Sequence, residues 1–456
     1  MNHQLSKRNS FRVRHAVLCV AVVILAWWPA RVALADEAPQ ARAYMNWLQA
    51  AVVQIEEDLV EISAAGERAA PLFLDGRNLG VRGRGGLASE LGGRAGGLMS
   101  YRGQPGNAGD IILYALGVPT NADADLTEQL VRELSDAQSL KNQGSLVIGI
   151  VSIAQLESLG KLDAARQACS VLLDNHAPAD DGALTDRSGR KVGPTITVAN
   201  AIVAWAWTCE LFAACTRAGK TPTVFQSLVQ DKDRARYKRY EGVRFHEDRQ
   251  VPPQASGALG RLYLQELRRI LREIGTASWT DLVRASDRAR ETLLDGGRVY
   301  VAAQGHYPVH HIGRVLPSDP GDFDPVINAK GKPAQVPGLN DLVIAVGYCF
   351  PPGAPEWKNM PWLGEAGRGV IYVLAGHDTP RNSLSRREWL VDQQWPVGDA
   401  VVRVEGYDVR IAPVSGITSI AMLWMIQMQV HEDVLAQRAA DKRLRADDRN
   451  LPEPAR

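Results

Sequence analysis

Two kinds of hydrophobic pattern alternate along the chain. Apolar residues recur at three- and four-residue steps from 40 to 70, which predicts a helix that Pro71 ends. Short apolar runs predict buried strands at 78–81, 111–116, 145–151 and 170–174. Helical patterns cover 121–135 and, as a long apolar stretch, 195–215. Strands that alternate with helices indicate a parallel sheet with right-handed crossovers.

The same order of elements then occurs a second time. A helical stretch at 262–294, broken near Gly275, leads to a strand within LLDGGRVYVAAQG, where the first half has LFLDGRNLGVRG. The later strands return at 340–347, 368–376 and 389–401, and the closing apolar helix returns at 414–430. Matched segments stay about 220–230 residues apart, a spacing that a chance resemblance would not hold over five elements. The chain is therefore predicted to be an internal duplication of one α/β unit.

The duplication and the composition shifts suggest five segments. They are a signal peptide (1–35), a first domain (36–220), a polar linker (221–257), a second domain (258–437) and a charged tail (438–456). The linker contains KDRARYKR, which is either a solvated connector or a contact for an anionic surface.

The first 35 residues have the features of a secretory signal. Basic residues precede an apolar run at 16–28, and Ala33-Leu34-Ala35 supplies the small residues that signal peptidases recognise. The run is shorter than the roughly 20 residues of a comfortable membrane span. We expect export to the periplasm or the extracellular space with cleavage near Ala35 and no span afterwards; an uncleaved anchor is the alternative.

Composition narrows the classes of function. At 456 residues with 45% hydrophobic and 23% charged residues, the chain is typical of a soluble protein with two ordinary domains. Removing residues 1–35 takes away five basic and no acidic residues, which changes the formal net charge from +1 to −4. That balance argues against nucleic acid as a partner. Only four cysteines remain, without CxxC spacing, so we expect buried free thiols and no disulfide framework.

Three short motifs in the first half carry a resemblance to a known family. They are DNHAPADDG from Asp174, VGPTITV from Val192 and PTVFQS from Pro222. In this order they resemble stand-alone sugar isomerase (SIS) proteins of the phosphosugar-binding kind. The second half keeps Asp392, Pro396, Gly398 and Asp399 of the first motif. The resemblance covers residues 40–245 well and 258–437 more loosely.

That resemblance implies a fold and a ligand. It implies two flavodoxin-like α/β/α three-layer domains, each with a parallel sheet that binds phosphosugars at the carboxyl ends of its strands. It also implies that the two halves pair face to face within the chain, with a homodimer as a further possibility. The family's hydroxyl-rich phosphate loop is degenerate here, because GVPTN (117–121) keeps only Thr120 and Asn121 and GYCFPPG (347–353) has no serine or threonine.

The glycine turn after the first strand is the leading candidate for a binding site. In NLGVRGRGGLASELGG, Arg82 and Arg84 stand among glycines where a strand meets a helix. Backbone N–H groups and guanidinium groups there suit a phosphate, a sulfate or a sugar carboxylate. Alternatively, the glycines only permit close packing of helix on sheet. The predicted ligand-binding set is Arg82, Gly83, Arg84, Gly85, Gly86, Ser89, Thr120, Asn121, Thr195 and Gln304.

Candidates for catalysis are weak and few. Glu90 follows the glycine turn and could act as a general base, or simply favour the helix dipole. His306, His310 and His311 cluster after the matching strand of the second half, where proton transfer or a polar lining is a better reading than metal binding, since Pro308 interrupts any helix. We expect no metal and no cofactor.

Four functions remain open from the sequence. The leading one is an exported tandem SIS-like protein that binds a phosphorylated or otherwise anionic sugar derivative, with or without turnover. The others are a sugar-phosphate isomerase-like enzyme with a divergent site, a solute-binding protein of a transporter, and a scaffold without a ligand. Contiguous lobes count against the solute-binding protein, whose chain commonly crosses its hinge several times.

Overall fold

The structure is a computed structural model. It describes residues 37–83, 85–101, 105–117, 126–227, 231–311, 323–325, 336–347, 361–379 and 381–449. The signal segment, Arg84, Thr120 and Asn121 lie outside the described residues.

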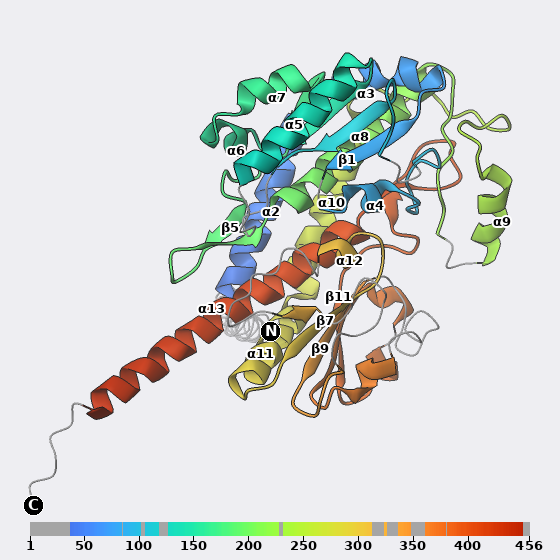
Figure 1. The fold of residues 1–456 in the computed structure, drawn as a ribbon. Coiled ribbons are helices and arrows are strands. Elements are labelled where there is room, and N and C mark those ends of the chain that lie inside the picture. Colours follow the sequence, from blue (N-terminus) through green and yellow to red (C-terminus); the bar gives the residue numbers. More distant parts are fainter. Residues whose placement is uncertain are drawn as a thin grey trace, which may run out of the picture. The chain divides into compact units, whose positions relative to one another are not determined.

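The first half contains a four-stranded parallel sheet in the order β1-β2-β3-β4 (Figure 1). Its strands are β1 (Leu79–Gly83), β2 (Ile111–Ala115), β3 (Leu146–Val151) and β4 (Val171–Asp174). Its helices are α2 (Pro39–Glu57), α3 (Leu59–Leu74), α4 (Leu87–Leu91), α5 (Leu126–Asn142), α6 (Ile153–Ser158), α7 (Leu162–Ala168) and α8 (Ile196–Arg217). A hairpin, β5 (Gly182–Thr185) and β6 (Lys191–Pro194), precedes α8.

The second half repeats this plan around a five-stranded parallel sheet in the order β11-β10-β9-β7-β8. Its strands are β7 (Val299–Ala303), β8 (Asp324–Pro325), β9 (Leu342–Val346), β10 (Gly369–Leu374) and β11 (Glu388–Asp392). Its helices are α10 (Ala258–Ala277), α11 (Trp279–Leu294), α12 (Pro308–His311) and α13 (Ser415–Arg449), with 3-10 turns η2 (Pro361–Glu365), η3 (Gly376–Asp378) and η4 (Arg381–Ser383). The hairpin β12 (Ala400–Val402) and β13 (Ile411–Pro413) precedes α13.

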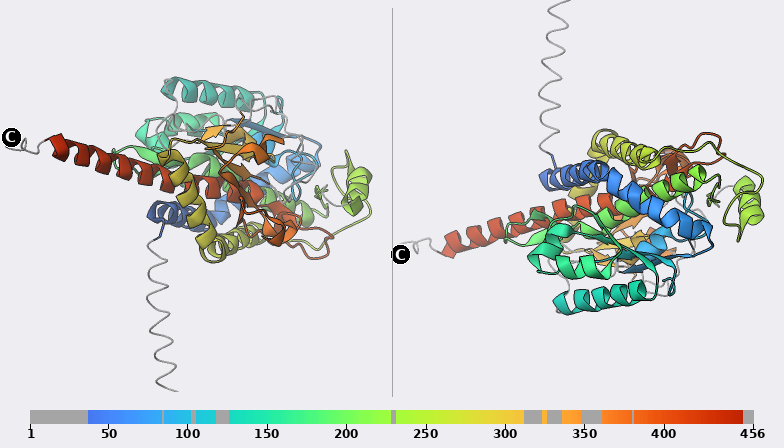
Figure 2. Two further views of the ribbon diagram at one scale, coloured as in Figure 1. Left: turned by 90° about the horizontal axis from the view of Figure 1, so that it is seen from below. Right: turned by 90° about the horizontal axis from the view of Figure 1, so that it is seen from above.

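Helices cover both faces of the first sheet. Buried side chains of α5 and α7 pack on Ile112, Tyr114 and Val147, and α3 and α8 contact β2 and β3 from the other side. Figure 2 shows the sheet between α3 and α5. Every residue of β2 and β3 is buried, which explains why these strands are uninterrupted apolar runs. The predicted α/β class with parallel sheets is confirmed.

Several helix boundaries differ from the prediction. The first helix is two helices that meet at Asp58, and Pro71 lies inside α3 instead of ending it. A proline in the last turn removes one helical hydrogen bond and α3 ends three residues later, so little is lost. The break in the second half falls at Ser278, after Gly275. The helix predicted at 121–135 is α5, which is described from Leu126 to Asn142.

Equivalent tyrosines make equivalent bonds in the two halves. The Tyr44 hydroxyl donates to the Pro194 carbonyl (2.8 Å), and the Tyr263 hydroxyl donates to the Pro413 carbonyl (3.3 Å). Pro194 ends β6 and Pro413 ends β13. The partners are about 219 positions apart, so the repeat seen in the hydrophobic pattern extends to individual buried contacts.

Equivalent aspartates hold the start of the closing helices α8 and α13. Asp181 and Asp399 are buried, and both have a positive φ (53° and 68°). The Oδ1 atom of each accepts two successive backbone N–H groups, those of Thr195 and Ile196 in one half and of Val414 and Ser415 in the other, at 2.6–3.1 Å. In each half, the aspartate carboxylate therefore occupies the position at the helix N-terminus where an anion would otherwise bind.

The halves also exchange contacts. Glu210 of α8 accepts the Gly257 and Gly260 N–H groups (both 2.7 Å) at the start of α10, while Gln429 of α13 accepts the Gln40 N–H (3.0 Å) near the start of α2. Each closing helix therefore holds the first helix of the opposite half. Residues 40–456 form one compact unit.

The linker packs against both halves. It includes α9 (Asp231–Tyr240), and Val224 forms an isolated β-bridge with Leu98 of the first half. Arg236 pairs with Asp408 (3.2 Å) and the His246 ring with the Tyr407 hydroxyl (3.0 Å), both in the second half. The prediction of a solvated connector therefore holds for only part of this segment.

The remaining predictions concern core and surface. Trp205, Trp207 and Trp424 are fully buried, as expected. Cys169, Cys209 and Cys215 are buried free thiols, and Cys349 lies outside the described residues. By length and composition one helix among the described residues, α8, could cross a membrane, but it is entirely buried within the fold. Helix α13 continues to Arg449 and its residues 437–443 are exposed, so the predicted tail is helical at its start.

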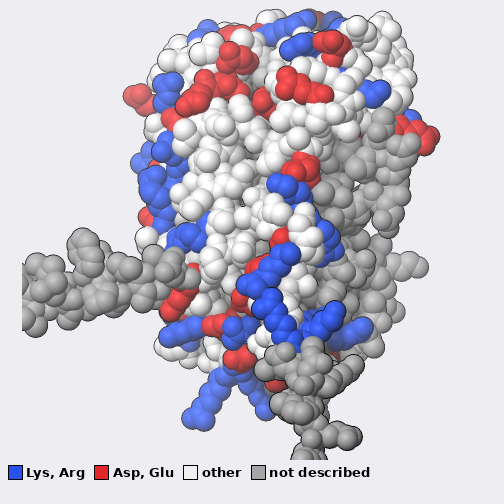
Figure 3. All heavy atoms as spheres, turned by 90° about the vertical axis from the view of Figure 1, so that its left-hand side faces the viewer, with Lys and Arg blue, Asp and Glu red and all other residues white. Residues whose placement is uncertain are grey.

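Basic and acidic side chains are interspersed on the face seen in Figure 3. Several form short-range pairs, such as Arg132 with Glu128 (2.8 Å) and Arg166 with Asp163 (3.2 Å). Such exposed pairs contribute little to stability.

Candidate functional site

The glycine turn lies where the sequence places it, at the carboxyl end of β1. Gly83 ends the strand, and Gly85 and Gly86 lead into α4, all three with positive φ (95°, 76° and 74°). A Cβ atom on Gly83 would lie 2.0 Å from the Ala115 carbonyl oxygen, so glycine is required there by the close approach of β2. The packing interpretation of these glycines is therefore correct for at least Gly83.

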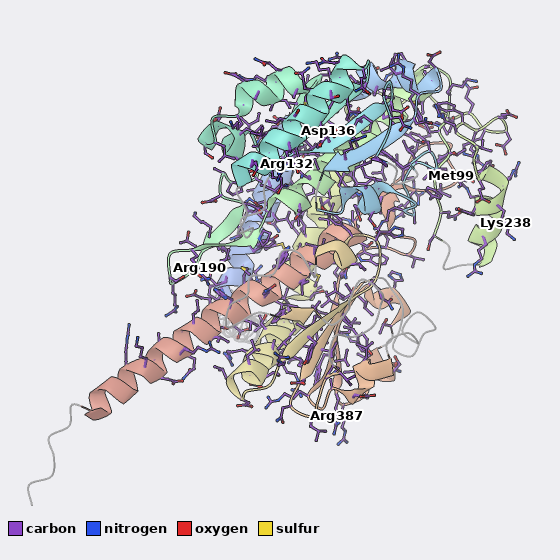
Figure 4. The ribbon with its side chains drawn as sticks, in the orientation of Figure 1. Met99, Arg132, Asp136, Arg190, Lys238 and Arg387 are labelled. Atoms are coloured by element: carbon purple, nitrogen blue, oxygen red, sulfur yellow. The ribbon has the colours of Figure 1, made fainter. Side chains whose placement is uncertain are left out.

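Arg82 points away from the turn. Its guanidinium forms an ion pair with Asp136 of α5 (2.9 Å) and donates to the carbonyls of Pro105 (2.9 Å) and Gly106 (3.1 Å). These contacts fasten β1 to α5 and to the loop before β2. Figure 4 labels Asp136 on that side of the sheet.

Glu90 faces the interior between α8 and α13. Its side chain is fully buried, and its Oε1 accepts the indole N–H of Trp205 (2.9 Å). Its Oε2 has no hydrogen-bond partner, and Arg94 Nε lies 3.9 Å away. Burial raises the pKa of Glu90 to about 7, although Arg94 and the Trp205 bond oppose the shift.

Arg94 of the first half, next to Glu90, contacts residues of the second half. Its guanidinium donates to Asp399 Oδ2 (2.8 Å) and to Ser415 Oγ (2.6 Å), and Ser415 donates in turn to Asp399 (2.7 Å). All three side chains are buried. A buried cation is thereby neutralised by the aspartate that also holds the start of α13.

Tyr307 makes the reciprocal contact from the second half. Its fully buried hydroxyl donates to the Thr197 carbonyl in the first turn of α8. The Thr197 hydroxyl itself is buried and has no partner, and its methyl group packs against Gly85, where a Cβ would lie only 2.5 Å away. Burial and then the charge of Glu90 raise the pKa of Tyr307. We call Glu90, Arg94, Thr197, Tyr307, Asp399 and Ser415 the inter-half cluster.

His306 lies at the edge of this cluster. Its carbonyl accepts the Ser89 hydroxyl (2.9 Å), and its ring lies beside Gly93. The residue is exposed overall, but desolvation of its ring and then the charge of Arg94 lower its pKa to about 4, while its hydrogen bonds with Ser89 and Gly92 oppose this shift. His306 is therefore neutral at physiological pH.

The structure thus brings together part of the predicted set. Gly85, Ser89, Glu90 and His306 meet at the turn. Thr195 is buried against Asp181 (2.9 Å), and Gln304 follows β7, where its N–H donates to the Val346 carbonyl (2.8 Å). Arg84, Thr120, Asn121 and the His310 side chain lie outside the described residues, so their proposed roles stay predictions.

Sequence reasoning missed Arg94 and Tyr307, whereas it offers Thr197, together with Thr195, as a cap of the closing helix or, by the resemblance, a ligand contact. The signal that could have found Arg94 is its position four residues after Glu90, a spacing typical of an ion pair on a helix, although α4 ends at Leu91, before Arg94. Tyr307 and Thr197 are about 110 residues apart and meet only because the halves pair. Within the described residues no group of His, Cys, Asp and Glu side chains could hold a metal ion.

The outer side of α4 lines a separate cleft of about 730 Å³. Ala88, Ser89, Gly92 and Gly93 form one wall, and Phe225, Tyr237 and Glu241 of the linker form the other. Glu90 is not among the lining residues, so α4 separates the cleft from the inter-half cluster.

Comparison with known proteins gives structural neighbours only. No family model and no curated protein matches the chain. Among solved structures, a candidate phosphosugar isomerase from Silicibacter pomeroyi is 10% identical, with a TM-score of 0.38 over 87% of this chain and 98% of its own. The C-terminal domain of glucosamine-fructose-6-phosphate aminotransferase from Francisella tularensis is 10% identical, with a TM-score of 0.42 over 86% and 95%. A candidate sugar-binding protein from Salmonella typhimurium is 10% identical, with a TM-score of 0.42 over 85% and 99%.

These neighbours are of the SIS type that the sequence motifs resemble. Because their TM-scores are below 0.5, they decide neither the ligand nor the site. The two parallel sheets and the matched contacts of the halves carry the fold assignment by themselves.

Proposed function

We propose that the protein binds a sugar derivative at the carboxyl edge of the first sheet, in a site walled by both halves. The observation that carries the proposal is that two buried polar atoms, Glu90 Oε2 and Thr197 Oγ1, have no hydrogen-bond partner, although Arg94 Nε lies 3.9 Å from Glu90 Oε2. Buried polar atoms normally have partners, and each unsatisfied one costs about 1–3 kcal/mol. A sugar hydroxyl can donate to a carboxylate and accept from a threonine, so a polyol would satisfy both atoms.

The anionic group of the ligand is assigned to the turn that contains Arg84. The inter-half cluster has little uncompensated positive charge for the anionic group, since Asp399 neutralises Arg94. Arg82 is likewise engaged by Asp136. Arg84, Thr120 and Asn121 lie outside the described residues, and the proposal that a phosphate or carboxylate binds them rests on the sequence and on the resemblance to SIS proteins.

The test is calorimetric titration with sugar phosphates, sugar sulfates and uronic acids. Thr197→Val should weaken binding about tenfold, the effect of one hydrogen bond to a buried hydroxyl. Thr208→Val is the matched control, because this buried threonine lies on the same helix and its hydroxyl is already bonded to the Ala204 carbonyl (2.7 Å). Arg84→Ala should abolish the preference for charged sugars. An absence of binding to every compound would leave the scaffold interpretation standing.

A sugar-phosphate isomerase is the second candidate. Its supporting observation is Glu90, whose pKa of about 7 suits proton transfer near neutral pH. An isomerase would exchange the hydrogen next to the sugar carbonyl with solvent, which proton NMR in heavy water detects. Glu90→Gln should abolish exchange and retain binding. Exchange that persists in this variant would exclude Glu90 as the base.

Export is proposed on sequence grounds. The intact protein should be shortened at Ala35 when it is produced in a secreting host, and mass spectrometry of the mature chain measures this directly. A mature chain that retains residues 1–35 in the membrane fraction would favour the anchor instead.

A further inference from the structure

Three neighbouring hollows lie along the linker on the side of α4 away from Glu90. The cleft of about 730 Å³ adjoins a hollow of about 360 Å³ through shared Phe225. It adjoins another of about 380 Å³ through shared Met99 and Gly242. We call these three hollows the linker groove. In Figure 4, Met99 beside α4 and Lys238 on α9 mark the part of the molecule where it lies.

Aromatic rings form one wall of the groove. Phe225 and Tyr237 stack with ring centroids 5.8 Å apart and an interplanar angle of 21°, and both side chains are partly exposed. Tyr101 and Met99 extend the apolar surface deeper into the largest hollow. An aromatic face of this kind packs on a flat ligand surface made of C–H groups, such as one side of a pyranose ring.

Charged side chains of the groove are largely compensated within the protein. Asp110 accepts the N–H groups of Asn78 (3.2 Å) and Asn107 (2.8 Å). Arg244 donates to the carbonyls of Phe73 (3.0 Å) and Arg77 (2.9 Å).

Asp408 pairs with Arg236 (3.2 Å) and Arg249 (3.4 Å). The two other charged lining residues, Glu241 and Arg410, have opposite signs and belong to different hollows. An ionic ligand would therefore find little uncompensated charge, whereas a neutral ligand with many hydroxyls meets both amide and carboxylate acceptors.

We propose that the linker groove binds a neutral oligosaccharide. The largest of the three hollows has the volume of a typical small-molecule site, and each of the other two shares lining residues with it, so several sugar units would be held. Rings would stack on Tyr237 and Phe225, and hydroxyls would bind Ser89, Glu241 and Gln226. This site lies outside α4, so it does not depend on the function proposed for the inter-half cluster.

The test is titration of the full chain with β-1,4-linked glucose and N-acetylglucosamine oligomers of one to six units. Affinity should rise with length, as successive units fill successive hollows. Tyr237→Ala should lower the affinity for the hexamer at least about tenfold, and Tyr237→Phe, which keeps the ring, should retain it. Thr197→Val should leave oligosaccharide binding unchanged, which separates this site from the one at the strand edge.

A second measurement does not depend on any variant. Saturating hexamer should slow hydrogen exchange of the amides at 89–93 and 237–242 and leave those of β3 unchanged. Equal affinities for one and six units, binding unaffected by Tyr237→Ala, or protection elsewhere would each overturn the proposal. Binding of peptides instead of both oligomer series would overturn it as well.

Discussion

The two halves of this protein share the buried contacts of their hairpins and closing helices, which we call the inner frame. They differ in the segments that cover the outer face of each sheet. In both halves a tyrosine reaches the end of the hairpin and an aspartate holds the closing helix. On the outer face the first sheet is covered by α5 and α7, whereas the described cover of the second sheet includes the short 3-10 segment η2. In this inner frame the halves contact one another, so a substitution there disturbs contacts of both halves.

The frame also differs at its centre. Thr197 and Gly416 occupy equivalent positions in the first turns of α8 and α13. Tyr307 contacts the backbone at Thr197, and Glu90 fills the space beside Gly416. The same architecture therefore presents an aromatic hydroxyl on one side and a buried carboxyl on the other, and the following experiments test that asymmetry.

The largest expected effect on stability comes from substituting Asp181 and Asp399, the equivalent aspartates of the two halves. Asp399→Ala should destabilise the protein by about 3–5 kcal/mol, because it leaves the Arg94 guanidinium buried without its partner. Asp181→Ala removes the bonds to the start of α8 and should cost about 1–2 kcal/mol. Urea denaturation of both variants measures the difference. Equal losses would show that Arg94 is not held by Asp399 in the folded state.

Glu90 should make stability depend on pH. Its folded pKa of about 7 is raised above the unfolded value, so the folded state binds this proton more tightly. The contribution is present below about pH 4.5 and is lost as pH rises through 7, by an amount on the order of 3 kcal/mol. Glu90→Gln should flatten the stability profile between these values. A profile identical to that of the unmodified protein would contradict the raised pKa.

Gly416→Ala should lower the free energy of unfolding by about 1–3 kcal/mol, because its side chain would fill space that Glu90 occupies. A Cβ atom there would lie 2.4 Å from Glu90 Oε2, and the buried carboxyl has little room to move. Combining Gly416→Ala with Glu90→Ala should recover part of the loss in a double-mutant cycle. Additive losses would show that the two residues do not meet.

The smallest effect concerns the linker. Tyr407→Phe should lower the free energy of unfolding by about 1 kcal/mol, since the hydroxyl binds both the Pro222 carbonyl (3.0 Å) and the His246 ring (3.0 Å).

Burial lowers the pKa of His246, so its neutral form is favoured in the fold and stability should fall as pH drops below about 6.5. Thermal denaturation between pH 5 and 8 measures this, and His246→Gln is the control that should lack the acid-side loss.

Periodicity predicted much of the fold because buried strands and helices leave strong local signals. The runs at 111–116 and 145–151 correspond to β2 and β3. The repeated motif at Asp392–Asp399 corresponds to the end of β11 and the loop before β12, where Asp399 accepts the N–H groups at the start of α13. Helix ends were less accurate, as at Pro71 and Gly275, because a single residue shifts the local preference by only about 1–3 kcal/mol and tertiary packing outweighs it.

The candidate site was only partly predictable. The sequence places Glu90 and Ser89 beside the glycine turn and His306 after the matching strand of the second half, whereas nothing local shows that Asp136 engages Arg82. The unpaired Thr197 hydroxyl and the cleft at the linker depend on contacts between distant segments.

The amino-acid sequence by itself determined the α/β class, the duplication and the position of the glycine turn, since each rests on short-range periodicity or on repeated residues. Only the tertiary structure decided which charges are neutralised, which polar atoms lack partners and how the halves meet. These properties belong to pairs of residues such as Arg94 and Asp399, which lie 305 positions apart. No local pattern encodes such a pair, because burial and hydrogen bonding arise only when the chain is packed.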